Sequence, residues 1–208
     1  MHTRTTWPTS SERERTILHA RDAVIVWDFD GTIVDTEHLH QQTILELLTR
    51  RGYTPEAGWF DLVMGTPEEV TWERLASQGA PVDTPAEMIA ERRGLYIDRA
   101  IAEVSASWIA GDLVPAFDRV GATQLVLSNG DFESNKAILD HIDLPHLTMI
   151  ERGHGSKAGK IKDIVPDMLL DDRASYITLG TQLGAWTVGV HTKATLGLLP
   201  ADVPVSIA

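Results

Sequence analysis

An apolar run that ends in two closely spaced aspartates limits what this chain can fold into more than any other stretch. The run Ala23–Val26 is typical of a buried strand, and Asp28 and Asp30 lie at or just past its end. Side chains two residues apart point to the same face of a strand, so these two carboxylates repel each other unless a positive group lies near them. A divalent metal ion is the simplest such group.

Two later apolar strands also end in polar residues. Gln124–Leu127 leads into Ser128-Asn129, and Met168–Leu170 leads into Asp171-Asp172, which could instead cap a following helix. Helical patterns separate the strands, and this alternation predicts a parallel sheet. Ligands bind beyond the carboxyl ends of such strands, so we expect the polar groups to meet there.

A helical block separates the first strand from the others. No convincing strand lies within 37–112, and we expect this segment to be a helical cap inserted into a core of 22–36 and 113–208. Residues 1–21 are expected to form an N-terminal tail with a short helix. Helices are expected over Glu12–Ala20, His38–Arg51, Pro67–Gln78, Pro85–Ala102, Val104–Ile109 and Asn135–His141, and a last strand over Thr187–Val190.

The composition disfavours several kinds of partner. The chain of 208 residues has a formal net charge of -12, which repels nucleic acid, and it has no apolar run of 18 residues that could cross a membrane. We therefore expect no nucleic-acid or membrane partner, and a monomer or a weak homo-oligomer. Cysteine is absent, which excludes disulfides and thiolate metal sites and fits a cytoplasmic location.

A basic stretch, Ser156–Lys160, precedes the last acidic pair. Either Lys157 or Lys160 could neutralise an anion, aided by the N-terminus of the helix that the stretch begins. Lys157 follows Ser156, a good capping residue, and has an isoleucine four residues later, as the start of a helix should. We therefore favour Lys157 and keep Lys160 as the alternative.

These four elements, in this order, resemble the four motifs of the haloacid dehalogenase (HAD) superfamily. Asp28–Asp35 (DFDGTIVD) is similar to the first motif, Leu125–Asn129 to the second, Lys157 or Lys160 to the third, and Leu169–Asp172 to the fourth. The insertion is similar to the small helical cap of the β-phosphoglucomutase and phosphoglycolate-phosphatase branch. The resemblance implies an α/β, Rossmann-like parallel sheet with helices on both faces and an inserted α-helical cap.

The resemblance also implies a role for each motif. Asp28 would be the nucleophile that forms an aspartyl-phosphate, and Asp30 would be the general acid and then the general base. The residues implied to hold Mg²⁺ are Asp28, Asp30 through its backbone carbonyl, Asp171 and Asp172. The residues implied to bind the phosphoryl oxygens are Gly31, Thr32, Ser128, Asn129 and Lys157.

The function that this resemblance implies is a Mg²⁺-dependent phosphatase acting on a small phosphorylated metabolite. The alternatives are a phosphomutase on a sugar phosphate and a catalytically idle binding protein on the same scaffold. In the mutases an arginine can hold a second phosphate at the place where this chain has Glu68, whose charge should repel it. His40, Trp59, Trp72 and Trp108 are interpreted first as packing residues, with substrate contact as the alternative.

Overall fold

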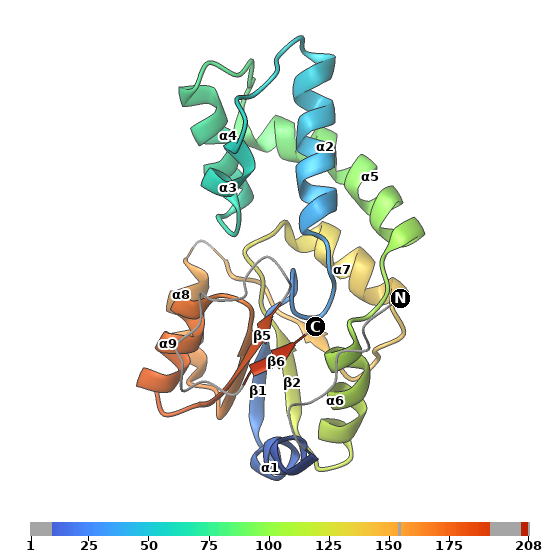
Figure 1. Ribbon diagram of the computed structural model, residues 1–208, viewed down its shortest axis with the longest axis vertical. Coiled ribbons are helices and arrows are strands. Elements are labelled where there is room, and N and C mark those ends of the chain that lie inside the picture. The colour runs from blue at the N-terminus through green and yellow to red at the C-terminus, as the bar shows by residue number, and fades with distance from the viewer. Residues whose placement is uncertain (1–9, 154, 192–204, 208) are drawn as a thin grey trace. The chain divides into compact units, whose positions relative to one another are not determined.

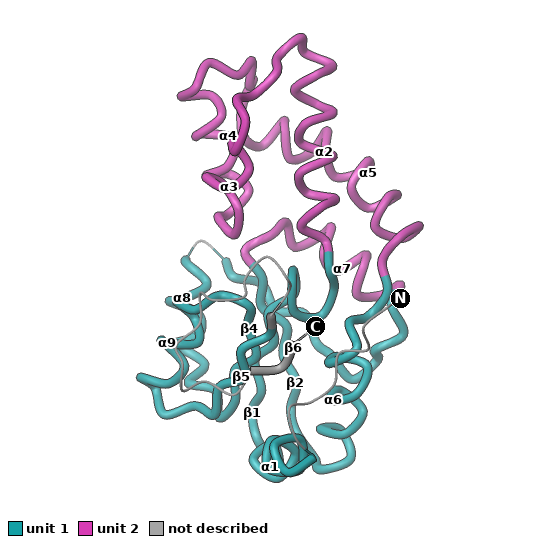
Figure 2. The backbone as a smooth tube through the Cα atoms, viewed as in Figure 1, with its two compact units in different colours: residues 1–35, 105–128, 142–208 teal, residues 36–104, 129–141 magenta. Residues whose placement is uncertain are grey.

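The computed structural model describes residues 10–153, 155–191 and 205–207 (Figure 1). The tail expected at the start of the chain, residues 1–9, lies outside these residues. The short helix expected after it is α1, Ser10–His19. Contacts divide the chain into two units, which Figure 2 colours separately. No helix within the described ranges is both long and apolar enough to span a membrane.

The sheet unit comprises Met1–Asp35, Ser105–Ser128 and Ile142–Ala208, and its described residues form six parallel strands in the order β3-β2-β1-β4-β5-β6. The strands are β1 (Val24–Trp27), β2 (Thr123–Val126), β3 (Thr148–Met149), β4 (Met168–Asp171), β5 (Trp186–His191) and β6 (Val205–Ile207). The strand order reverses between β1 and β4, which lie side by side. Such a switch point is where open α/β sheets bind ligands.

Helices cover both faces of this sheet, as the sequence predicts (Figure 1). Helix α6 (Trp108–Asp118) lies on one side, and α8 (Lys157–Ile164) and α9 (Ala174–Gln182) lie on the other, while α1 packs against α6 at the bottom of the view. The helix predicted over Val104–Ile109 is wrong in its bounds. Ser107 accepts a hydrogen bond from the Ala110 amide and caps α6, so the chain is extended before this point and helical after it.

Helix α9 lies close to the sheet because Gly180 has no side chain. A Cβ at this position would come within 2.8 Å of both Leu169 Cδ2 and Thr187 Cγ2, on β4 and β5. This approach is tighter than any real carbon contact, so a larger residue would push the helix away from the strands. Gly180 therefore allows α9 to pack closely against β4 and β5.

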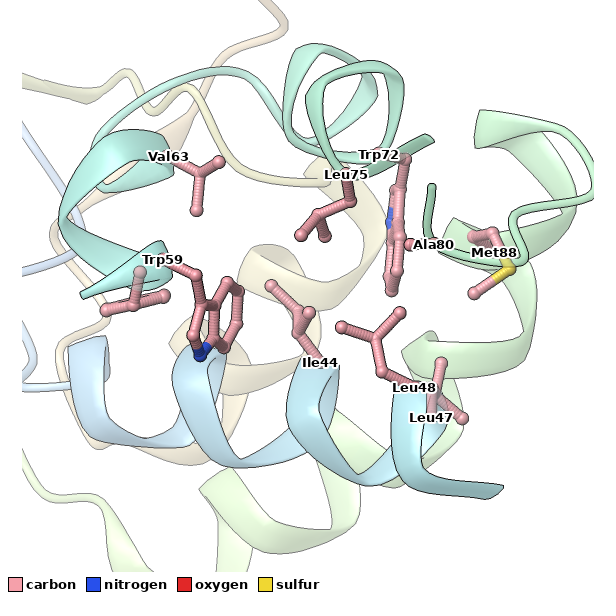
Figure 3. Close-up of a cluster of buried hydrophobic side chains, with 10 residues drawn as sticks. Ile44, Leu47, Leu48, Trp59, Val63, Trp72, Leu75, Ala80 and Met88 are labelled. Carbon is pink, nitrogen blue, oxygen red and sulfur yellow. The ribbon is translucent and has the colours of Figure 1, made fainter. Parts of the chain in front are cut away.

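The helical unit comprises Thr36–Val104 and Asn129–His141 and has a hydrophobic core of its own (Figure 3). Its helices are α2 (Glu37–Arg50), α3 (Trp59–Val63), α4 (Glu68–Ser77), α5 (Pro85–Glu103) and α7 (Phe132–His141). In Figure 3, Ile44, Leu47 and Leu48 of α2 lie among Trp59, Trp72 and Leu75. Trp59 and Trp72 are thus packing residues, 7% and 0% exposed.

The bounds of this unit differ from the predicted insertion at two places. Residues 105–112 group with the sheet unit, since α6 packs against α1 and β2. Residues 129–141 group instead with the helical unit, because α7 packs against α5. The Arg93 guanidinium makes two hydrogen bonds of 2.8 Å to the Asp131 carboxylate just before α7, and this ion pair joins the two chain segments.

A buried polar network joins α2, α4 and α5. The Arg92 side chain is 2% exposed and donates to both Glu68 carboxylate oxygens, at 2.6 and 2.8 Å. Arg92 also contacts Thr43 Oγ1 at 2.9 Å and His40 Nδ1 at 3.3 Å. Tyr96 Oη lies 2.9 Å from His40 Nε2. His40 therefore has partners at both ring nitrogens, in keeping with a packing role.

Candidate active site

The predicted site residues lie where three neighbouring strands end. Asp28 directly follows β1, Ser128 comes two residues after β2, and Asp171 is the last residue of β4. The Asp28 amide donates to the Leu170 carbonyl at 2.8 Å, which extends the β1–β4 pairing to the site. Because all three strands are parallel, their carboxyl ends meet at one edge of the sheet.

A buried ammonium lies between two of these aspartates. Lys157 Nζ donates to Asp28 Oδ1 at 2.5 Å and to Asp171 Oδ2 at 2.6 Å, and its side chain is 1% exposed. Lys157 is the first residue of α8, and Ser156 caps that helix by accepting from the Gly159 amide at 3.0 Å. Of the two lysines that the sequence offers, Lys157 is the one that contacts Asp28.

A third buried carboxylate, that of Asp172, lies close to the two that contact this ammonium. Ligand oxygens of Asp28, Asp171 and Asp172 all lie within 4.8 Å of one another. Asp171 Oδ1 also accepts from the Arg173 amide at 2.8 Å, just before α9, so this residue both contacts Lys157 and stabilises a helix start. Asp172 Oδ2 is buried and makes no hydrogen bond within the described structure. A buried, unpaired carboxylate oxygen is costly, and a cation is the partner that it lacks.

The turn after β1 brings the backbone close to that oxygen. Gly31 has φ +81°, and a Cβ there would lie 2.8 Å from Asp172 Oδ2, so both the turn and the approach require glycine. The Gly31 amide donates to the Val34 carbonyl at 2.7 Å and closes the turn. Ser107, which belongs to none of the four motifs, donates from Oγ to the Thr32 carbonyl at 2.7 Å and stabilises the turn.

The remaining predicted residues divide between the two units. Ser128 Oγ lies 3.1 Å from Asp30 Oδ2, and Thr32 Oγ1 lies 3.3 Å from Asp28 Oδ2, so these hydroxyls contact the two acids of the first motif. Asn129 groups with the helical unit, where its amide donates to the Gly65 carbonyl at 3.4 Å. Its contact with a phosphoryl group stays a prediction.

Burial is the largest influence on the pKa values of the charged side chains at this site. Burial raises the pKa of Asp28 to about 7, although Lys157 opposes the shift. Burial and the charges of Asp28 and Asp171 raise the pKa of Asp172 to about 9. Burial alone would lower the pKa of Lys157, but Asp171 and Asp28 outweigh it and raise that pKa.

The donor set fits a hard divalent cation. The three carboxylates offer oxygen ligands, and one of these oxygens has no other partner. A second positive charge beside Lys157 would favour the ionised forms of Asp28 and Asp172, which burial disfavours. Chemically, the group can bind a cation and hold an ionised carboxylate at the end of β1.

Residues 25–108 match the model of a protein family described as haloacid dehalogenase-like hydrolase. The chain has the haloacid dehalogenase-like fold. The matched segment contains the first motif and most of the helical unit, and the resemblance predicted from the motifs, including that to a hydrolase, is confirmed. No curated protein sequence matches the chain.

Solved structures show the same fold over most of the chain. CbbY from Rhodobacter sphaeroides, in complex with phosphate, has a TM-score of 0.70 at 14% identity, covering 90% of this chain and 93% of its own. A HAD hydrolase, family IA, variant 3, from Entamoeba histolytica has a TM-score of 0.66 at 16% identity, covering 82% and 84%. β-Phosphoglucomutase from Clostridium difficile has a TM-score of 0.63 at 14% identity, covering 85% and 87%.

The two lysines of α8 should differ sharply in their effect on stability. Lys157→Met removes the ammonium from between buried carboxylates and should lower the free energy of unfolding by about 3–5 kcal/mol, because breaking a buried ion pair leaves its partners uncompensated. Lys160→Met, one turn further along the same helix, should change it by less than about 0.5 kcal/mol. Urea unfolding at pH 7.5 measures both, and equal effects of the two substitutions would contradict the assignment.

Proposed function

We propose that this protein is a Mg²⁺-dependent phosphatase that hydrolyses a small phosphomonoester through an aspartyl-phosphate on Asp28. The observation that carries the proposal is the buried group at the β1–β4 switch point. There Lys157 donates hydrogen bonds to Asp28 and Asp171, and Asp172 has a buried oxygen without a hydrogen-bond partner. The similarity of the fold to that of CbbY, whose structure contains phosphate, supports a phosphoryl ligand.

The metal ion would be held by the carboxylates of Asp28, Asp171 and Asp172, with the backbone carbonyl of Asp30 as a further ligand. Bound there, Mg²⁺ would supply positive charge that offsets the negative charge of the transferring phosphoryl group. The protein's own cation, Lys157, would add to this charge through its hydrogen bond to the Asp28 carboxylate. Together, Lys157 and Mg²⁺ would offset the negative charge of the site's carboxylates, so a phosphate could bind there even though the chain as a whole has a net charge of -12.

In the first step, an oxygen of the ionised Asp28 carboxylate forms a bond to phosphorus while the bond from phosphorus to the ester oxygen breaks. Asp30 gives its proton to that departing oxygen, so an alcohol leaves and Asp28 bears the phosphoryl group. Ser128 and Thr32 contribute by orienting the two acids, since their hydroxyls lie 3.1 Å from Asp30 and 3.3 Å from Asp28.

In the second step, a water molecule attacks phosphorus and the bond to Asp28 breaks. Asp30, now ionised, takes a proton from this water, so inorganic phosphate leaves and both acids return to their starting forms. The same residue thus acts as an acid and then as a base. Asp30 is suited to both roles because it is only partly buried, unlike Asp28.

The mutase alternative is less strongly disfavoured than the sequence suggested. Glu68 was expected to repel a second phosphate, but its carboxylate is buried and paired with Arg92. The pair is close to neutral, so Glu68 is not evidence against a diphosphorylated intermediate. Hydrolysis and transfer differ instead in whether water or a second substrate hydroxyl takes the phosphoryl group. The idle binding protein is disfavoured because the acidic motifs are all present. The cytoplasmic location remains a prediction from the cysteine-free sequence.

Asp28→Asn should abolish turnover of p-nitrophenyl phosphate while the protein stays folded. The amide is nearly the same shape, but it is a poor nucleophile and carries no charge for the metal. We expect the rate of p-nitrophenol release to fall by at least about 10³-fold. Asp163→Asn, which changes an exposed aspartate of α8, is the matched control and should keep full activity. A wild-type rate in the Asp28 variant would exclude it as the nucleophile.

Mg²⁺ should stabilise the protein and be required for turnover. A ligand that binds only the folded state raises the free energy of unfolding by about 2.7 kcal/mol when its concentration is 100 times its dissociation constant. The melting temperature should therefore rise when Mg²⁺ is added and fall again when EDTA removes it. Asp172→Asn should remove most of this rise in melting temperature, because it replaces a charged carboxylate ligand of the metal with a neutral amide. Full activity in metal-free buffer would contradict the requirement.

A hydrolase should release one phosphate for each substrate molecule consumed. In ¹⁸O-labelled water, with the enzyme already cycled in that water, the released phosphate should carry a single labelled oxygen, because water attacks phosphorus in the second step. Mass spectrometry of the phosphate measures this. Little free phosphate, with a phosphorylated isomer of the substrate accumulating instead, would identify a mutase.

A further inference from the structure

The ammonium of Lys157 has a third neighbour besides its two carboxylates. Its Nζ lies 4.5 Å from the centre of the Tyr176 ring, on α9. An ammonium has three N–H groups, and two of them are accounted for by Asp28 and Asp171. The aromatic face therefore takes the place that water would occupy beside an exposed lysine. Nothing in the four sequence motifs identifies this tyrosine.

The position of the ring follows from the packing of α9. Tyr176 lies one turn before Gly180, on the same side of the helix, and Gly180 allows the helix to approach β4 and β5 closely. The ring also packs against a small apolar cluster that includes Ile161 of α8 and Leu169 of β4. Tyr176 is thus fixed by both the neighbouring helix and the sheet.

We propose that Tyr176 is a positioning residue for phosphoryl binding, because its ring keeps the Lys157 ammonium directed at Asp28. This inference rests on the proposed phosphatase function. The electron-rich face of the ring attracts the buried cation, whereas an aliphatic side chain of similar bulk would fill the space without attracting it. Without the ring, the ammonium can turn toward α9 and admit water, and its charge would act less fully on a phosphoryl group at Asp28.

Two aromatic replacements of Tyr176 distinguish the attraction between its ring and the Lys157 ammonium from simple packing of the ring. Tyr176→Phe keeps the ring and its electron-rich face, and it should leave KM for p-nitrophenyl phosphate and the inhibition constant of inorganic phosphate within about twofold of wild type. Pentafluorophenylalanine at the same position has nearly the same shape, but the fluorines reverse the charge of the ring face. It should raise both constants by about tenfold, with a smaller change in kcat.

The matched control is the same pair of replacements at Tyr53, a half-buried tyrosine of the helical unit. Neither replacement there should change KM or the inhibition constant. Equal constants for phenylalanine and pentafluorophenylalanine at Tyr176 would overturn the inference and leave the ring a packing residue. So would an equal effect at Tyr53, since it would indicate a general consequence of fluorination.

A second measurement does not depend on turnover, so failure of the inference can be distinguished from failure of the proposed function. Urea unfolding of the two Tyr176 variants should show an unfolding equilibrium constant about tenfold larger for the fluorinated ring. In a Lys157→Met background this difference should disappear, because the cation is gone. A wild-type protein without phosphatase activity would refute the proposed function. An unfolding difference that persists without Lys157 would refute the inference.

Discussion

A single ammonium holds the candidate active site together. Lys157 is buried between Asp28 and Asp171, beside Asp172, in a place where three carboxylates would otherwise repel one another. Its position requires the central strands to be neighbours and α8 to begin at the Ser156 cap. The fold and the site therefore depend on the same contacts, because buried ionised acids at neighbouring strand ends are costly unless positive charge lies beside them.

The helical unit also contains a buried acid that is paired with a buried cation. Its apolar core is accompanied by a buried ion pair, Arg92–Glu68, and the Arg92 side chain also contacts Thr43 and His40 of α2. A buried pair of this kind contributes little net stability, but removing one partner is costly. Glu68 is therefore buried and paired, which removes the electrostatic argument against a mutase. What separates the two functions is whether water or a substrate hydroxyl takes the phosphoryl group.

The sequence predicted the elements whose patterns are strong. β1, β2, β4 and β5 are apolar runs, and α2, α4 and α5 have apolar residues at helical spacing. The elements that it missed are short or contradict local propensity. β3 has two residues, β6 has three and α3 has five. Helix α9 was predicted only as an alternative, as a helix capped by Asp171-Asp172, because the β-branched and aromatic residues Tyr176, Ile177 and Thr178 favour strands.

The sequence by itself determined the kinds of group at the site. The residues Asp28, Asp30, Asp171 and Asp172 follow apolar strands, and parallel strands must place such ends together. Only the tertiary structure decided between Lys157 and Lys160. Successive residues of an α-helix differ by about 100° in direction, so two lysines three residues apart have different neighbours, and the packing of α8 fixes which one enters the site. The same holds for Tyr176, whose contact with Lys157 joins two helices that no local pattern relates.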